Sequence, residues 1–149
     1  MINGTTQDYR IGDISLKIAI AIFVVVLLII APHYAYKLYA DGISYLSIAR
    51  EYAVGNFSGA INAVWGPLIS WLLVPLQLIG LNVEESYRVF ALLLGVATIA
   101  SFGFLLQRLR CSRITGRLFL CDMVPIALYV SISDLTPDAI LKFLMLNVV

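Results

Sequence analysis

Uncharged apolar runs alternate with short polar segments along the chain. Residues 18–36, 89–107 and 118–133 are apolar runs of roughly the length that crosses a membrane as a helix. A fourth run, 61–81, is also long enough, but its glycines, prolines and tryptophans equally suit a helix lying at the membrane surface. The pattern predicts an all-α integral membrane protein with about three transmembrane helices and further helices along a membrane face.

The polar segment after the first run has the spacing of an amphipathic helix. Its apolar positions are Tyr45, Ala49, Tyr52 and Ala53, with Leu46 and Ile48 beside them. Such a helix lies along the membrane surface, and Asp41 stands at its start. The local sequence favours a helix N-cap for Asp41. It also favours a structural role for Asp138, because Thr136 fits the N-cap and Pro137 the first helical position.

Composition supports a membrane protein and argues against several other classes. Hydrophobic residues make up 61% of the 149 residues and charged residues 13%, against about a quarter charged in a soluble domain. The net charge of +1, without a basic run carrying interleaved aromatics outside a membrane loop, gives no sign of nucleic-acid binding. Cys111 and Cys121 form neither a CxxC motif nor a Cys/His cluster, so they predict no metal or redox motif.

Charge counting limits the topology without fixing it. If 61–81 does not cross and the N-terminus is inside, six Lys and Arg residues are cytoplasmic and four are outside. If 61–81 crosses with the N-terminus inside, the count reverses, which the positive-inside rule disfavours. If it crosses with the N-terminus outside, the count is again six to four. Two topologies are left, and both make the arginine-rich segment 108–117 cytoplasmic.

Three segments, in order, resemble the N-terminal part of a known enzyme family. Residues 41–50, followed by Gly55-Asn56-Phe57, are similar to a first outer loop in which an acid precedes a Tyr-x-x-Ile-Ala helix. Residues 63–68, with Trp71 beyond, resemble a Pro-Leu and aromatic element before a juxtamembrane helix. Residues 135–141 resemble an acid-bearing second outer loop. The family is the polytopic lipid-sugar glycosyltransferases of the GT-C class, in particular the superfamily of dolichyl-phosphate-mannose–protein mannosyltransferases and aminoarabinose transferases.

The resemblance implies a layout for the whole chain as one membrane domain. The expected parts are a cytoplasmic tail 1–17, a span 18–36, an outer loop with juxtamembrane helices 37–88, a span 89–107, a cytoplasmic loop 108–117, a span 118–133, and a second outer loop with the start of the next helix 134–149. Because the family's segment matching 61–81 lies along the outer face, the resemblance favours three spans. Since family members are several times longer, we expect an N-terminal fragment with an incomplete GT-C fold.

The resemblance also implies a reaction. A sugar passes from a polyprenyl-phosphate-linked donor to an acceptor at the outer face of a membrane, which we expect to be a prokaryotic plasma membrane. Asp41 takes the place of the general base. Asp138, with Asp134 as a weaker substitute, is the expected lipid-phosphate or metal site, and a divalent cation, Mg²⁺ or Mn²⁺, is expected at Asp138. Membrane lipid and the donor are the expected partners, nucleic acid is not, and the sugar and acceptor are left open.

A different class of function fits the same sequence. A chain with about three spans would also serve as a small non-catalytic membrane assembly subunit, or be a truncated, inactive remnant, so whether this chain is itself an enzyme stays open. A transporter fragment would need charged residues inside the membrane facing a pathway, and only Asp122 qualifies.

Overall fold

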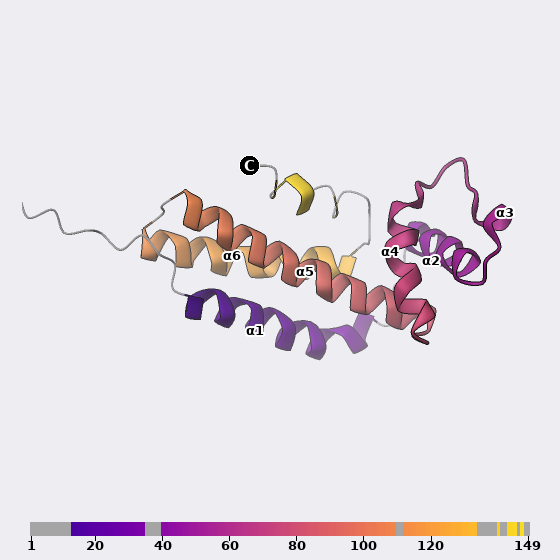
Figure 1. The fold of residues 1–149 in the computed structure, drawn as a ribbon. Coiled ribbons are helices and arrows are strands. Elements are labelled where there is room, and N and C mark those ends of the chain that lie inside the picture. Colours follow the sequence, from indigo (N-terminus) through magenta and orange to yellow (C-terminus); the bar gives the residue numbers. More distant parts are fainter. Residues whose placement is uncertain are drawn as a thin grey trace, which may run out of the picture.

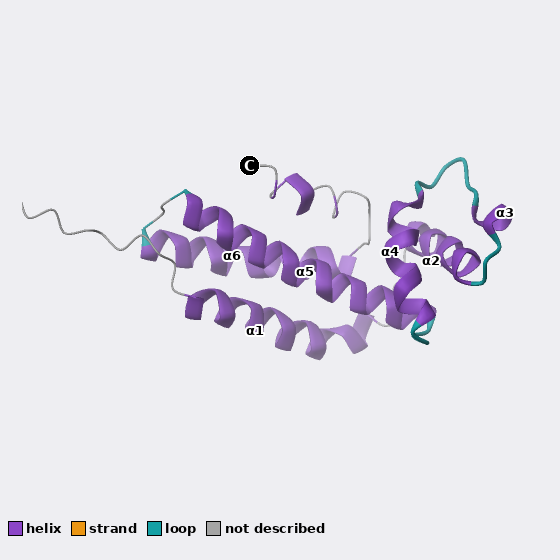
Figure 2. Cartoon of the chain, viewed as in Figure 1, coloured by secondary structure: helices purple, strands orange, loops and turns teal. Residues whose placement is uncertain are grey.

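The computed structural model describes residues 13–34, 40–109, 112–133, 140, 143–145 and 147. Within these residues all regular structure is helical and no strand is present (Figures 1 and 2). The elements are α1 (Asp13–Ile30), the 3-10 helix η1 (Ala31–Tyr34), α2 (Ala40–Ala53), α3 (Phe57–Ala60), α4 (Pro67–Leu78), α5 (Val83–Arg108) and α6 (Arg113–Ser133). The expected all-α class is confirmed.

The three longest helices form a bundle, in which α1, α5 and α6 each contact the other two (Figure 1). In the described residues, three helical segments are long and apolar enough to cross a membrane: Ile14–Tyr34, Val83–Arg108 and Ile114–Ile132. Large apolar side chains on their outer faces, among them Leu28, Phe104 and Leu118, are exposed. Exposed apolar surface on this scale is typical of a lipid-facing bundle, so the chain is a membrane protein with three candidate spans.

α5 begins earlier than the apolar run it contains, because a cap rather than hydropathy sets its start. The Asn82 side chain accepts a hydrogen bond of 2.8 Å from the Glu85 backbone N–H. The Glu85 side chain in turn accepts one of 2.9 Å from the Asn82 backbone N–H. This capping box places the first helical residue at Val83, inside the segment expected to belong to the outer loop.

α6 also begins earlier than expected. The Ser112 hydroxyl oxygen accepts a hydrogen bond of 3.2 Å from the Thr115 backbone N–H, and the Ser112 carbonyl accepts one of 2.8 Å from Gly116. These bonds start α6 at Arg113, so the expected cytoplasmic loop 108–117 is largely helical. The connection between α5 and α6 is correspondingly short.

The apolar run 61–81 does not form one helix. The Asn62 side chain accepts hydrogen bonds of 2.8 and 3.3 Å from the backbone N–H groups of Val64 and Trp65, which makes a turn. Only the 12 residues of α4 are helical, about 18 Å against a hydrocarbon core of about 30 Å. Gly80, with φ of 94°, follows in the left-handed conformation that glycine tolerates. The run is therefore not among the helices that are long enough to cross a membrane.

The two ends of the bundle differ. α2, α3 and α4 gather at one end, here called the α2–α4 end, where α4 lies beside the start of α5 (Figure 1). The opposite end carries the start of α1 and the connection between α5 and α6. We call it the arginine end, because Arg108 ends α5 there and Arg117 lies in the first turns of α6.

Both large and small residues contribute to the close packing of the bundle core. Phe23, Ile99 and Leu120 are almost completely buried between the three helices. A Cβ atom added at Gly95 would overlap the Phe23 ring. The absence of a side chain at Gly95 therefore lets α1 approach α5 closely.

Candidate functional site

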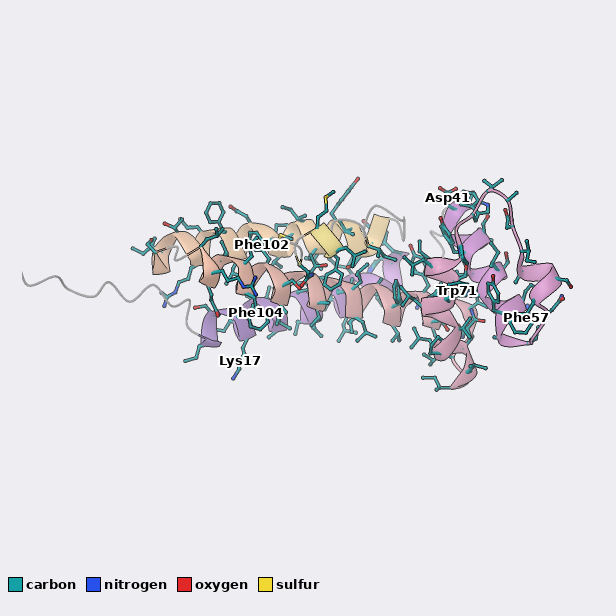
Figure 3. The ribbon with its side chains drawn as sticks, turned by 45° about the horizontal axis from the view of Figure 1, so that its top comes forward. Lys17, Asp41, Phe57, Trp71, Phe102 and Phe104 are labelled. Carbon is teal, nitrogen blue, oxygen red and sulfur yellow. The ribbon has the colours of Figure 1, made fainter. Side chains whose placement is uncertain are left out.

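Asp41 lies in the first turn of α2 at the α2–α4 end of the bundle, and its side chain is exposed (Figure 3). No described side chain forms a hydrogen bond or an ion pair with its carboxylate. The carboxylate is therefore accessible, as a group that receives a proton from a bound substrate has to be.

The helix-cap interpretation of Asp41 is not what the structure shows. α2 begins at Ala40, so Asp41 is already inside the helix. The Ser44 hydroxyl donates a hydrogen bond of 3.0 Å to the Ala40 carbonyl in this same turn. A carboxylate in the first turn is stabilised by the helix dipole, typically by about 0.3–1 kcal/mol. The structural contribution of Asp41 is thus a modest charge effect.

The buried face of α2 is largely the expected one, and only its C-terminal end is less buried. Its buried residues are Gly42, Tyr45, Leu46, Ile48 and Ala49. Tyr52 and Ala53 were expected on this face but are only partly buried. The Tyr52 ring lies instead beside those of Phe57 and Trp71, each with ring centres 6.1 Å away. The central part of this face, which carries Tyr45, is the part that packs against α4.

α4 is fixed on α2 by a buried hydrogen bond and by ring packing. The Ser70 hydroxyl donates a bond of 3.0 Å to the Tyr45 backbone carbonyl. The Tyr45 and Trp65 rings meet edge to face with centres 5.4 Å apart. Leu73 of α4 and Ile140 are buried in the same cluster. The start of α2, and with it Asp41, is therefore held on a packed support.

The Asp41 charge acts on Tyr45, one helical turn away. Burial, and in second place the Asp41 carboxylate, raise the pKa of the Tyr45 phenol above its ordinary value of 10.0. Residues four apart share one face of a helix. Asp41 therefore lies on the side of α2 that packs against the rest of the protein, although its own carboxylate is exposed.

An apolar groove opens between the ends of α1, α5 and α6 on this side of the molecule. Its volume is about 450 Å³, within the range of about 300–1,000 Å³ typical of ligand pockets. Apolar lining residues include Leu27, Leu28, Ala31, Leu92 and Ile132. Glu84 and Arg88 add charge to the lining, 3.9 Å apart and with side chains 52% and 41% exposed. The groove thus joins an apolar interior to a charged margin.

Tyr87 connects this groove to α2. The ring lines the groove, and a Cβ atom built on Gly42 would lie 3.4 Å from its Cε2 atom. Asp41 directly precedes Gly42 in the chain, so it lies one position before the residue of α2 that packs against a side chain of the groove. The sequence pattern predicts Asp41 as a site residue but does not predict Tyr87 or the groove. A tyrosine just after two acids at the start of a span was the available signal, as tyrosine is enriched at membrane interfaces.

The other expected site residues cannot be compared with the structure. Asp134 and Asp138 lie outside the described residues. In the described part of the chain, no three His, Cys, Asp or Glu side chains are grouped so as to hold a metal ion. The cation expected at Asp138 stays a prediction.

A scan against protein-family models, a search of curated proteins and a search of solved structures each found no match for this chain.

Proposed function

We propose that the chain forms part of a membrane glycosyltransferase, in which Asp41 is the general base for sugar transfer from a polyprenyl-phosphate donor. One observation carries the proposal: Gly42, the residue after the exposed Asp41, packs against Tyr87, and Tyr87 lines a groove bounded by three candidate spans. A lipid-linked sugar keeps its tail in the bilayer, so its reacting carbon must meet the base at the interface. An acid on a surface helix beside an apolar groove suits that requirement.

The reaction assigns one proton transfer to Asp41. The oxygen of an acceptor hydroxyl attacks the anomeric carbon and forms the new glycosidic bond. The bond from that carbon to the phosphate oxygen breaks, and the polyprenyl phosphate leaves with the electron pair. The hydroxyl proton passes to the Asp41 carboxylate. A base so placed typically contributes two to four orders of magnitude in rate, about 10²–10⁴.

Arg88 is the basic residue that lines the groove, and in this proposal it attracts the phosphate of the donor. Its contact with Glu84 is at 3.9 Å between half-exposed side chains, an arrangement that stabilises little. A phosphate that gains charge as the sugar leaves is a group with which arginine forms strong, charge-assisted hydrogen bonds. Groove, arginine and carboxylate would then receive the tail, the phosphate and the reacting end of one donor.

The catalytic assignment is tested in membranes of the cells that carry the protein. The membranes are supplied with radiolabelled polyprenyl-phosphate mannose or polyprenyl-phosphate aminoarabinose. These are the donor types of the family that the chain resembles. We expect Asp41→Asn to lower sugar transfer about 10²–10⁴-fold at equal protein level. Glu51→Gln is the matched control, since it makes the same chemical change on the same helix and its oxygen can still accept from Asn56. If both variants keep parental transfer, Asp41 is not the base.

The donor site is tested separately with the purified chain in lipid nanodiscs and a photoreactive polyprenyl phosphate. Leu28→Trp puts a bulky ring into the groove at a position 62% exposed. Val25→Trp adds the same ring to α1 at a position 54% exposed that does not line the groove. We expect the first variant to lose labelling and the second to keep it. Equal labelling of both would place the donor elsewhere. If the parent chain shows neither donor labelling nor sugar transfer, the non-catalytic subunit is favoured.

A further inference from the structure

A second groove lies at the arginine end of the bundle, between α1 and α6, with a volume of about 670 Å³. Ile14, Ile18 and Ile22 form one wall, at intervals of one helical turn along α1. The opposite wall, on α6, includes Arg117, Cys121 and Pro125, again one turn apart. Because both helices start at this end, the two walls run in the same direction from the membrane surface inward.

The inner part of this groove is apolar. Ala19, Leu120 and Val124 are buried in the bundle core and also line the groove, so they form its floor. The isoleucines of the wall are exposed, from 73% at Ile14 to 49% at Ile22. Both helices are candidate spans, so this part of the groove lies at the depth of lipid acyl chains. An occupant has to present a flexible or narrow apolar segment there.

The outer part of the groove is positively charged. Arg117 is exposed, lines the groove, and has no acidic side chain within ion-pair distance among the side chains that the structure describes, which do not include that of Asp13. Asp122, the nearest acid along α6, is five positions further on and so lies about 140° around the helix. Lys17 and Arg108 are exposed at the same end of the bundle. The mouth therefore attracts an anion, and the arginine stem can extend toward the interface.

We propose that this groove binds one anionic phospholipid, with an acyl chain between α1 and α6 and its phosphate at Arg117. Charge complementarity selects this occupant: a positively charged mouth over an apolar floor matches a lipid with an anionic headgroup, and a zwitterionic lipid matches it less well. The site is at the opposite end of the bundle from Asp41 and does not depend on sugar transfer.

The test is native mass spectrometry of the purified chain, titrated in detergent with phosphatidylglycerol or phosphatidylcholine. We expect one phosphatidylglycerol to be retained per chain and phosphatidylcholine to be lost. Arg117→Gln should weaken retention about fivefold, the effect of one basic residue near an anionic lipid. The matched control is Arg108→Gln, which removes the same charge at the same end but outside the groove lining, and should change retention little.

A second pair of variants tests the groove without changing charge. Cys121→Trp fills the groove at an exposed position, and Leu118→Trp adds the same ring to an exposed α6 position that does not line it. We expect the first to abolish retention and the second to keep it, with helix content checked by circular dichroism. Equal weakening by both arginine variants, unchanged retention in Cys121→Trp, or equal binding of both lipids would overturn the proposal. So would a dimer whose formation Cys121→Trp prevents, because a second copy would then occupy the groove.

Discussion

A hydrogen bond between Ser70 and Tyr45 joins α4 to α2 at the α2–α4 end of the bundle. The Ser70 hydroxyl is fully buried and donates a hydrogen bond of 3.0 Å to the Tyr45 backbone carbonyl, 25 positions earlier in the chain. Serine within an apolar helix is tolerated when its hydroxyl finds such a partner. The bond fixes α4 against the face of α2 that carries Tyr45, and thereby the support of Asp41.

Ser70→Ala should therefore lower the free energy of unfolding by about 1 kcal/mol, the usual net value of a buried hydrogen bond. The measurement is thermal unfolding in detergent followed by circular dichroism. Ser47→Ala is the control, because the Ser47 hydroxyl is exposed and bonds only to the Ser44 carbonyl of its own helix. An equal effect of the two variants would show that the bond between the helices contributes nothing.

The candidate spans could be predicted because each contains a long, largely uncharged run. A helix that crosses a bilayer has to be both long and apolar. The run 61–81 has the same length but is interrupted by the turn at Asn62 and by Gly80, so hydropathy alone misjudges it. The position of Asp41 at the start of a helix could be predicted because amphipathic spacing is a local pattern. The groove beside Tyr87 could not be found, because three helices distant in sequence make its walls.

Gly95→Ala tests the packing of α1 on α5. In an unconstrained helix this change would stabilise by roughly 0.5–1 kcal/mol. Here the new Cβ atom would overlap the Phe23 ring, so we expect destabilisation of about 1–3 kcal/mol instead. Thermal unfolding shows directly whether Gly95→Ala stabilises or destabilises the protein. Adding Phe23→Leu should remove part of the penalty in a double-mutant cycle, and strictly additive effects would mean that the two positions do not contact each other.

The orientation in the membrane is tested by cysteine labelling after Cys111 and Cys121 are replaced by serine. Ser58 is exposed in α3 at the α2–α4 end, and Ser112 precedes α6 at the arginine end. The positive-inside rule predicts a cytoplasmic arginine end. An impermeant thiol reagent should then label Ser58→Cys in intact cells, and Ser112→Cys only after permeabilisation. The reverse pattern would invert the orientation, and labelling of both in intact cells would contradict the separation of the two ends.

Tyr45 reports on the charge of Asp41. Burial is the larger cause of its raised pKa and the Asp41 carboxylate the smaller. Asp41→Asn should therefore lower the pKa of Tyr45 toward, but not to, its ordinary value. Absorbance titration of tyrosinate in the parent and in Asp41→Asn, each compared with its Tyr45→Phe derivative, isolates this one phenol. An unchanged Tyr45 titration in Asp41→Asn would mean that the two side chains do not interact.

The same raised pKa makes stability depend on pH. Because the folded protein favours the neutral phenol, the contribution of Tyr45 is complete below the unfolded pKa of about 10 and is lost as pH rises through the higher folded value. We expect the free energy of unfolding to fall above about pH 10, and to fall less steeply in Tyr45→Phe, which has no phenol to ionise. Chemical unfolding across this range, in parent and variant, measures the difference. If the two curves are parallel, the Tyr45 phenol has the same pKa in the folded and unfolded chain, and its packing against Trp65 does not exclude water.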